Sequence, residues 1–383
     1  MPLTYPYQQY QGVWTLSQAS DAVAQSKWPS PPAPHLYAWG SNSLGQLGLN
    51  NTTGYSSPQQ VGSLTTWANI FGRGNSFFAI KTDGTLWSNG FNNFGQLGFG
   101  NTTNYSSPKQ IGSLTNWSFV ANGSYQALAI KTDGTLWAWG RNNSGQLGLG
   151  NTTSYSSPKQ VGGLTNWSKI STGDAHSVAI KTDGTIWSWG QNNFGSLGLG
   201  NTTYYSSPKQ IGALTTWLNV SCGRYSSVAL KTDGTIWSWG WNSNGQLGLG
   251  ISTYYTKSPQ QIGALTTWST IASGLKFTFA IKTNGSLWSW GDNSFGQLGL
   301  GNITNYSSPK QVGALTNWLK IAGAYQAVSI KTDGTFWAWG YNGSGQLGLG
   351  NTTNYSSPKQ VGSLTTWSSL TVLNQSTFGI ATT

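Results

Sequence analysis

Short apolar runs separated by polar, glycine-rich stretches predict a chain of short β-strands. In one representative stretch the expected strands are Trp167–Ile170, Ser177–Thr182, Thr185–Trp189 and Pro208–Ile211. Asp183-Gly184 separates the second run from the third and predicts a two-residue hairpin turn with positive φ at both residues. Residues 192–203 are rich in Gly and Asn and predict a long loop. The pattern therefore indicates four antiparallel strands in each stretch.

This stretch repeats with a period of about 50 residues. Copies of Lys-Thr-Asp-Gly-Thr-Leu-Trp open at Lys81, Lys131, Lys181, Lys231, Lys282 and Lys331. A Trp-Gly pair follows at Trp39, Trp139, Trp189, Trp239, Trp290 and Trp339, with Asn89 in the remaining slot. Seven four-stranded units of this period predict an all-β, seven-bladed β-propeller.

The two ends of the array complement each other. Residues 35–40 match a third strand with no first or second strand before it, and residues 378–383 match a second strand with no third after it. An N-terminal strand, Leu36–Trp39, is therefore expected to complete the C-terminal blade and close the ring, which removes two open sheet edges. The expected domains are an N-terminal extension, 1–34, and the propeller, 35–383.

Three motifs resemble the regulator of chromosome condensation repeat. They are Trp-Gly-x-Asn-x-x-Gly-Gln-Leu-Gly at 139–148, Pro158-x-x-Val161, and Gly173-x-x-His176-Ser-Val-Ala-Ile180. The resemblance covers 35–383 and implies a seven-bladed propeller of similarly permuted blades. The founding member of that family is a nucleotide-exchange factor whose inserted wedge contacts a small GTPase. Here no insertion of wedge size interrupts the period, so exchange activity is not expected.

Many of the charged and aromatic residues recur at the same positions in each repeat. The net charge is +11 with no Glu, and five of eight Asp and eleven of nineteen Lys and Arg occupy periodic columns. A nucleic-acid-binding protein more often gathers its basic residues on one face, so no nucleic-acid partner is expected. Nineteen of the 22 Trp also fall in three columns, which favours blade packing over ligand stacking.

Few residues suit catalysis or metal binding. With no Glu, paired carboxylates would have to be turn Asp residues. His35 and His176 lie in different blades, and the single cysteine, Cys222, has no neighbouring His in the repeat pattern. We therefore expect a non-enzymatic protein with no cofactor and no metal site, and a structural role for His176 is favoured over a chemical one. No stretch has the length and hydropathy of a membrane span.

Variation between the repeats is confined to two short segments, one after the first strand and one after Trp-Gly. In an up-and-down blade both connections lie on one face, so this face should collect the residues that break the period. The candidate binding residues are Arg73, Phe91, Tyr125, Arg141, His176, Arg224, Tyr225, Trp241, Tyr325 and Tyr341. Tyr, Trp and Arg dominate interaction hot spots. Drift in unconstrained loops is the alternative explanation.

Residues 1–34 break the period and suggest an attachment segment. Aromatic and apolar residues gather there at Tyr5, Tyr7, Tyr10, Trp14, Leu16 and Trp28. The stretch Gln11–Ala19, continuing to Lys27-Trp28-Pro29, is similar to N-terminal segments of marine tailed-phage structural proteins. Pro29–Pro34 predicts a stiff linker.

These features suggest a virion surface protein that is assembled in the host cytoplasm, either a tail fibre that binds a receptor or a capsid decoration. Other virion proteins would hold residues 1–34, and a host surface glycan or protein would meet the propeller. A homo-oligomer is compatible with this layout. The alternative is a bacterial lectin-like or protein-interaction propeller, in the cytoplasm or on the cell surface.

Overall fold

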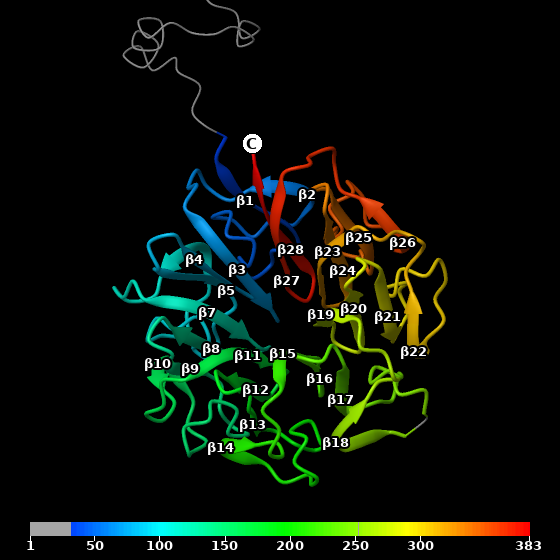
Figure 1. Cartoon of the computed structure of the whole chain (residues 1–383). Coiled ribbons are helices and arrows are strands. Elements are labelled where there is room, and N and C mark those ends of the chain that lie inside the picture. The colour runs from blue at the N-terminus through cyan, green and yellow to red at the C-terminus, as the bar shows by residue number, and fades with distance from the viewer. Residues whose placement is uncertain (1–31, 252) are drawn as a thin grey trace, which may run out of the picture. The chain divides into compact units, whose positions relative to one another are not determined.

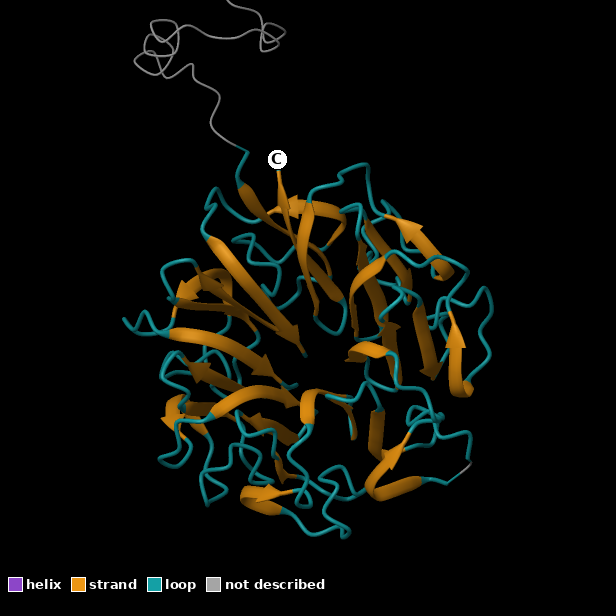
Figure 2. Cartoon of the chain, viewed as in Figure 1, coloured by secondary structure: helices purple, strands orange, loops and turns teal. Residues whose placement is uncertain are grey.

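The computed structural model describes residues 32–251 and 253–383, and Pro34–Thr382 form one compact unit. This unit consists of seven four-stranded antiparallel sheets, arranged radially around a common centre (Figure 1). The described residues fold into strands and loops without helices (Figure 2). The expected all-β, seven-bladed propeller is confirmed.

Each blade has a first strand at the ring centre and a fourth at the rim. The first strands are β3 (Trp67–Arg73), β7 (Trp117–Asn122), β11 (Trp167–Thr172), β15 (Trp217–Cys222), β19 (Trp268–Ser273), β23 (Trp318–Gly323) and β27 (Trp367–Val372). The second strands are β4 (Ser76–Lys81), β8 (Gln126–Lys131), β12 (His176–Lys181), β16 (Ser226–Lys231), β20 (Phe277–Lys282), β24 (Gln326–Lys331) and β28 (Ser376–Thr382).

The third strands are β5 (Leu86–Gly90), β9 (Leu136–Gly140), β13 (Ile186–Gly190), β17 (Ile236–Trp241), β21 (Leu287–Gly291), β25 (Phe336–Gly340) and β1 (Pro34–Gly40). The fourth strands are β6 (Tyr105–Gln110), β10 (Tyr155–Gln160), β14 (Tyr205–Gln210), β18 (Tyr255–Gln261), β22 (Tyr306–Gln311), β26 (Tyr355–Gln360) and β2 (Tyr55–Gln60). The blade that contains β3–β6 is called blade 1, and the numbers follow the chain to blade 7, which contains β27, β28, β1 and β2.

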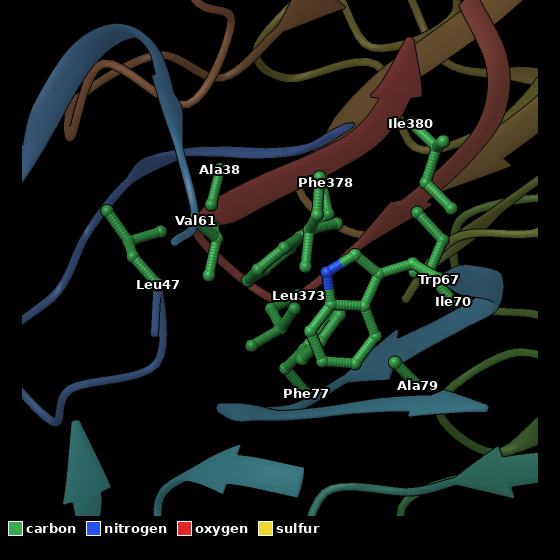
Figure 3. Packing of buried hydrophobic residues seen from close by; sticks show 11 residues of the cluster. Ala38, Leu47, Val61, Trp67, Ile70, Phe77, Ala79, Leu373, Phe378 and Ile380 are labelled. Atoms are coloured by element: carbon green, nitrogen blue, oxygen red, sulfur yellow. The ribbon is translucent and has the colours of Figure 1, made fainter. Parts of the chain in front are cut away.

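The two ends of the chain close the ring as expected. β1 pairs with β28 from Pro34↔Thr382 to Gly40↔Ser376, and the order in blade 7 is β2-β1-β28-β27. Each end therefore supplies two strands to this blade. Figure 3 shows Phe77 of blade 1, Phe378 of blade 7 and Trp67 in one cluster, and the two phenyl rings stack with centroids 4.2 Å apart. The closing blade thus packs on blade 1 through an apolar core.

The hairpin after the second strand differs from the expected turn type. Gly84 has φ +76, but Asn50 is the only non-glycine residue with positive φ in the described chain. Lys81 N donates to Thr85 O, so the loop holds three residues, and its glycine supplies the left-handed position. The Asp83 carboxylate accepts from Thr85 N and from Thr85 Oγ1 at 2.9 and 2.6 Å. These bonds fix Asp without a positive φ, so the two-residue prediction was wrong.

The Trp and Lys columns serve the blades, as the period suggested. Trp139 is fully buried, and its Nε1 donates to Gln96 O of the preceding blade at 2.8 Å. Lys81 Nζ lies 3.6 Å from the ring centroid of Trp87 and 5.2 Å from that of Trp67. Burial lowers the pKa of Lys81 despite the nearby Asp83. These side chains are occupied by structural contacts within the ring.

Blade 1 replaces the Trp of Trp-Gly with Asn89, and two features compensate. Asn89 Nδ2 donates to Gln46 O at 2.9 Å, which reproduces the bond of the indole N–H to the preceding blade. Phe77, directly opposite Asn89 in the β4–β5 ladder, is fully buried where the other blades carry Ala, Ser or Thr. In blade 1 the large side chain therefore lies on the second strand instead of the third.

Candidate binding face

The two variable segments of a blade lie side by side at one end of it. The segment between the first and second strands is called the link, and the segment after the third strand is called the Trp-Gly loop. Arg141 N donates to Tyr125 O at 2.9 Å, and Trp241 N donates to Tyr225 O at 3.0 Å. We call this end of the propeller the variable face.

The Asp-Gly hairpins and the connections between blades meet at the opposite end, called here the hairpin face. Trp117 N donates to Gly84 O at 3.2 Å, and Thr82 N donates to Thr66 O at 2.9 Å. The topology therefore separates the variable segments from the uniform ones, as the up-and-down order predicted.

A buried amide network holds each Trp-Gly loop in shape from below. Asn142 is fully buried; its Oδ1 accepts from Leu147 N at 2.9 Å, and its Nδ2 donates to Asn151 O at 3.0 Å. Gln146 Oε1 accepts from Ser144 N at 2.9 Å. Because these repeated amides fix the backbone, the side chains above them are free to differ between blades.

The first group of variable residues gathers between blades 1 and 2. The Phe94 ring lies 5.0 Å from the ring of Tyr125, and Phe91 lies 6.2 Å from it. The Arg141 guanidinium carbon lies 5.2 Å from the Phe94 centroid and 5.6 Å from the Tyr125 centroid. Aromatic rings and one cation thus form a single cluster across the junction.

A second cluster of the same design lies between blades 3 and 4. The ring centroid of Phe194 lies 5.5 Å from that of Tyr225 and 5.8 Å from that of Trp241, and the rings of Phe194 and Trp241 are stacked. Tyr254 extends the cluster and is 55% exposed. Lys276 Nζ lies 5.4 Å from the Trp241 ring centroid.

The third cluster lies between blades 5 and 6. The ring centroid of Tyr341 lies 4.9 Å from that of Phe295 and 6.1 Å from that of Tyr325. Phe295 and Tyr325 are each 38% exposed. The residues of the three clusters correspond one to one in the repeat: Phe94, Phe194 and Phe295; Tyr125, Tyr225 and Tyr325; Arg141, Trp241 and Tyr341.

Three of the other four junctions carry small or polar residues at the same three positions. They are Ser144, Ala175 and Gln191; Asn244, Lys276 and Asp292; and Ser344, Gln375 and Ser41. The seventh junction, between blades 7 and 1, has Leu44, Asn75 and Phe91. The aromatic clusters therefore occupy every second junction from blade 1 to blade 6. Seven of the clustered residues were predicted from the sequence as binding residues, but the alternation was missed, although a comparison of repeats about 100 residues apart shows it.

Charged residues join neighbouring links around the ring. The Asp174 carboxylate accepts from Arg224 Nε at 2.9 Å and from Ser124 Oγ at 2.8 Å. Arg224 N donates to Leu275 O at 2.9 Å. Burial alone would lower the pKa of Arg224, but Asp174 and Tyr225 together outweigh the effect of burial and the pKa is raised. Arg224 is thus a fixed cation beside Tyr225, with the ring centroid 5.3 Å away.

His176 lies beneath the variable face, so its expected place on the surface is wrong. It is 1% exposed, and Nε2 lies 3.2 Å from Ser227 Oγ of the next blade. A Cβ atom on Gly173 would lie 2.1 Å from His176 Cε1, so the glycine makes room for the inward-facing ring. Burial, followed by the charge of Arg73, lowers the pKa of His176 to about 3. The imidazole is therefore neutral at pH 7.

Arg73 also points inward rather than across the face. Its Nη1 donates to Cys222 O, which links blade 1 to blade 4. Nε and Nη2 are buried with no partner among the described residues, and burial lowers the pKa of Arg73. The Cys222 thiol is buried, and burial raises its pKa. Arg73 and His176 therefore belong to the interior of the ring, and the other eight predicted residues lie on the variable face.

The remaining predictions concern attachment and metal binding. Tyr5, Tyr7, Tyr10, Trp14, Leu16 and Trp28 lie outside the described residues. His35 lies in β1, where Nδ1 is 3.2 Å from Gln60 Nε2. Within 32–251 and 253–383, no three His, Cys, Asp or Glu side chains group closely enough to hold a metal ion. The same residues include no helix with the length and hydropathy of a membrane span.

The fold and the repeat motifs define a propeller of regulator of chromosome condensation repeats. The RCC1-like domain matches residues 168–383, and the regulator of chromosome condensation (RCC1) repeat matches residues 35–72, 83–130 and 133–180. The chain therefore belongs to the RCC1-like propeller family, in agreement with the sequence resemblance. No curated protein matches the chain.

Solved structures share the fold at low sequence identity. Human WBSCR16 is 19% identical, with a TM-score of 0.82 over 92% of this chain and 99% of that chain. Yeast RCC1 (Prp20), solved with Kap60 bound, is 18% identical, with a TM-score of 0.82 over 92% of this chain and 90% of that chain. At these identities the likeness shows the fold alone.

Proposed function

We propose that this protein is a non-enzymatic binding head, in which the variable face recognises a partner and residues 1–34 attach the propeller to a larger assembly. The observation that carries the proposal is the gathering of Tyr, Phe, Trp and Arg into three clusters on the face where the repeats differ. Such residues supply most of the binding energy at protein interfaces. The family relationship is consistent with this role, since yeast RCC1 is solved with a bound partner protein, Kap60.

The chemistry of the interior supports binding over catalysis. The imidazole of His176 is buried and neutral at pH 7, and the thiol of Cys222 is buried with a raised pKa. A nucleophilic thiol needs a lowered pKa and access to substrate. Neither side chain has the environment of a catalytic group.

The assembly that we propose is the virion of a tailed phage, with the propeller outward and residues 1–34 held by other virion proteins. The support is the similarity of the N-terminal stretch to phage structural proteins, together with the Pro-rich linker that follows it. The location would be the virion surface, on a tail fibre or on the capsid. The alternative is a bacterial lectin-like or scaffold propeller, in the cytoplasm or on the cell surface.

Two experiments test the proposal. Mass spectrometry of purified virions encoded by the same genome should detect this chain, and its absence would leave the bacterial alternative. Adsorption of the labelled full chain to a panel of bacterial strains should fall at least tenfold when Trp241→Ala and Tyr341→Ala are combined. The matched control combines Leu214→Ala and Leu315→Ala, which are each 50% exposed in connections on the hairpin face. Equal adsorption by both double variants would contradict a binding role for the variable face.

A further inference from the structure

We propose that the three aromatic clusters are corresponding subsites for an acidic polysaccharide, an inference that rests on the proposed binding function of the variable face. Each cluster combines three chemical features in one place: aromatic rings, amide or hydroxyl groups, and, in two of the clusters, a cation. Together these features fit a sugar ring that carries a carboxylate.

The rings supply the apolar part of the subsite. Phe295 and Tyr325 of the third cluster are each 38% exposed, and the rings of Phe94, Tyr125, Phe194 and Tyr225 in the other two are partly exposed. Ring surface therefore remains open to a ligand after the rings have packed on one another. A pyranose ring presents C–H groups on its faces, and such groups pack well on the electron-rich face of an aromatic ring. Tyr adds a hydroxyl that can donate to or accept from a sugar hydroxyl.

Polar side chains border each cluster at a repeated exposed position. Asn93 follows the buried Asn92 in the first cluster, and Asn193 and Ser294 stand at the same position in the other two. Tyr204 Oη donates to Asn193 Oδ1, which holds this amide beside the second cluster. An amide both donates and accepts, as vicinal sugar hydroxyls require.

Charge selects an acidic ligand over a neutral one. The variable face carries Arg141, Arg224 and Lys276 against only Asp174 and Asp292, since Arg73 points into the ring. Arg141 lies over Phe94 and Tyr125, and Lys276 lies over Trp241, so each cation is fixed at the edge of a ring platform. A carboxylate on a bound sugar would meet these cations. Among the described residues no cation lies over the rings of the third cluster, so it should be the weakest subsite.

The surplus of positive charge is too small for a polymer as densely charged as nucleic acid. Asp174 already pairs with Arg224 at 2.9 Å. The Lys of the second strands lie over Trp rings at the hairpin face, as Lys81 does 3.6 Å from the centroid of Trp87. A polysaccharide with one carboxylate per sugar suits sparse cations between aromatic platforms better than a phosphate backbone does.

The repetition of the clusters implies a repeating ligand. Three similar subsites on one rigid ring raise the effective concentration of a polymer once its first segment has bound. A long chain should therefore bind more tightly than a short one of the same sugar, although each subsite contacts only a few sugars.

Calorimetry with defined probes tests the ligand class. The full chain is titrated with alginate oligosaccharides of about 4 and about 20 uronate residues, and with dextran, poly-L-glutamate and oligo-dT as comparisons. We expect the longer alginate to bind at least tenfold more tightly than the shorter one, and at least tenfold more tightly than the comparison polymers. Equal or tighter binding of poly-L-glutamate or oligo-dT would overturn the sugar assignment, and equal binding of dextran would overturn the role of charge.

The stoichiometry of binding tests whether each of the three clusters is a subsite. Tyr125→Ala, Tyr225→Ala and Tyr325→Ala each place in an aromatic cluster the residue that Ala175 supplies at a polar junction. Three short oligosaccharides should bind per wild-type chain, two per single variant and none in the triple variant. A ratio of one in the wild type, or a ratio that the variants leave unchanged, would overturn the proposal.

Different results would contradict the acidic polysaccharide as ligand and the binding function of the variable face. If alginate does not bind but strain adsorption still depends on Trp241 and Tyr341, the ligand class is wrong and the binding function stands. If adsorption is also independent of these residues, the binding function fails with it.

Discussion

The hairpin face and the variable face are two ends of the same seven blades, yet they use their residues differently. At the hairpin face one set of bonds recurs: an Asp carboxylate bonds the Thr two residues on, and that Thr accepts from a Trp indole, as in Asp133, Thr135 and Trp137. At the variable face the recurring residues lie underneath, as buried amides such as Asn142. Side chains that carry the structure repeat, whereas those above the amide network differ from blade to blade.

The difference teaches where to look for function in a repeat protein. Residues that recur in every unit are explained by contacts inside the ring, so they give little information about a partner. Information about the partner lies in the exceptions, and among these only the exposed ones can contact it. Substitutions at the hairpin face should therefore cost stability, and substitutions at the variable face should cost binding.

The largest expected effect is at a hairpin glycine. Gly134 has φ +77, and a Cβ atom there would lie 2.0 Å from Thr165 O. Gly134→Ala should lower the free energy of unfolding by about 4 kcal/mol or more, because the backbone of the neighbouring connection must move. Gly162→Ala is the control, since Gly162 has φ +60 but no atom within 4 Å of that Cβ position. It should cost about 1 kcal/mol in urea unfolding; equal losses would mean that the close contact does not matter.

Acidification should destabilise the protein through His176. Its pKa is about 3 in the folded protein and 6.5 in the unfolded chain, so the unfolded chain binds more protons between these values. Stability should therefore fall as the pH is lowered from 6.5 to 3, by about 3 kcal/mol at pH 4. His176→Gln supplies the residue that blades 2 and 6 carry, Gln126 and Gln326, and should remove this part of the pH dependence. Parallel stability–pH curves for both proteins would refute the buried, neutral imidazole.

Restoring the repeat Trp at position 89 of blade 1 should lower the free energy of unfolding by less than the two changes above. Asn89→Trp restores the repeat residue but leaves Phe77 opposite it, so overpacking should destabilise the protein by about 2 kcal/mol. Adding Phe77→Ala, as in blades 2 and 6, should recover most of this loss. Additive losses in the double-mutant cycle would show that the two positions are not coupled.

The smallest effect on stability is expected at the variable face. Tyr325→Ala removes a ring that is 38% exposed and contacts Tyr341 edge-on. The free energy of unfolding should fall by about 1 kcal/mol or less, measured by urea denaturation. A loss as large as that of Gly134→Ala would erase the distinction between the faces.

The sequence predicted the blades, their number and the closure, because strand period and turn residues repeat seven times. It failed on the hairpin type, because Asp-Gly suits a two-residue turn as well as the end of a three-residue loop, and bonds from Thr85 to Asp83 decide between them. It placed Arg73 and His176 on the surface because variation marks a segment but not the direction of a side chain. The glycine at 173, which lets His176 turn inward, acts through a contact only the fold reveals.

The aromatic clusters could not be predicted from the sequence for a related reason. Phe94 and Tyr125 lie 31 residues apart in different blades, and their contact depends on how neighbouring blades pack. The alternation of aromatic and polar junctions was nevertheless present in the sequence as a period of two repeats.

The central claim is that binding resides on the variable face alone, and adsorption of two matched triple variants tests it most directly. One variant carries Tyr125→Ala, Tyr225→Ala and Tyr325→Ala, and the other carries Leu164→Ala, Leu214→Ala and Leu315→Ala in connections of the hairpin face. The account predicts that the tyrosine variant loses adsorption to a binding strain at least tenfold while the leucine variant stays within twofold of the wild type. Loss in the leucine variant with adsorption kept by the tyrosine variant would contradict it.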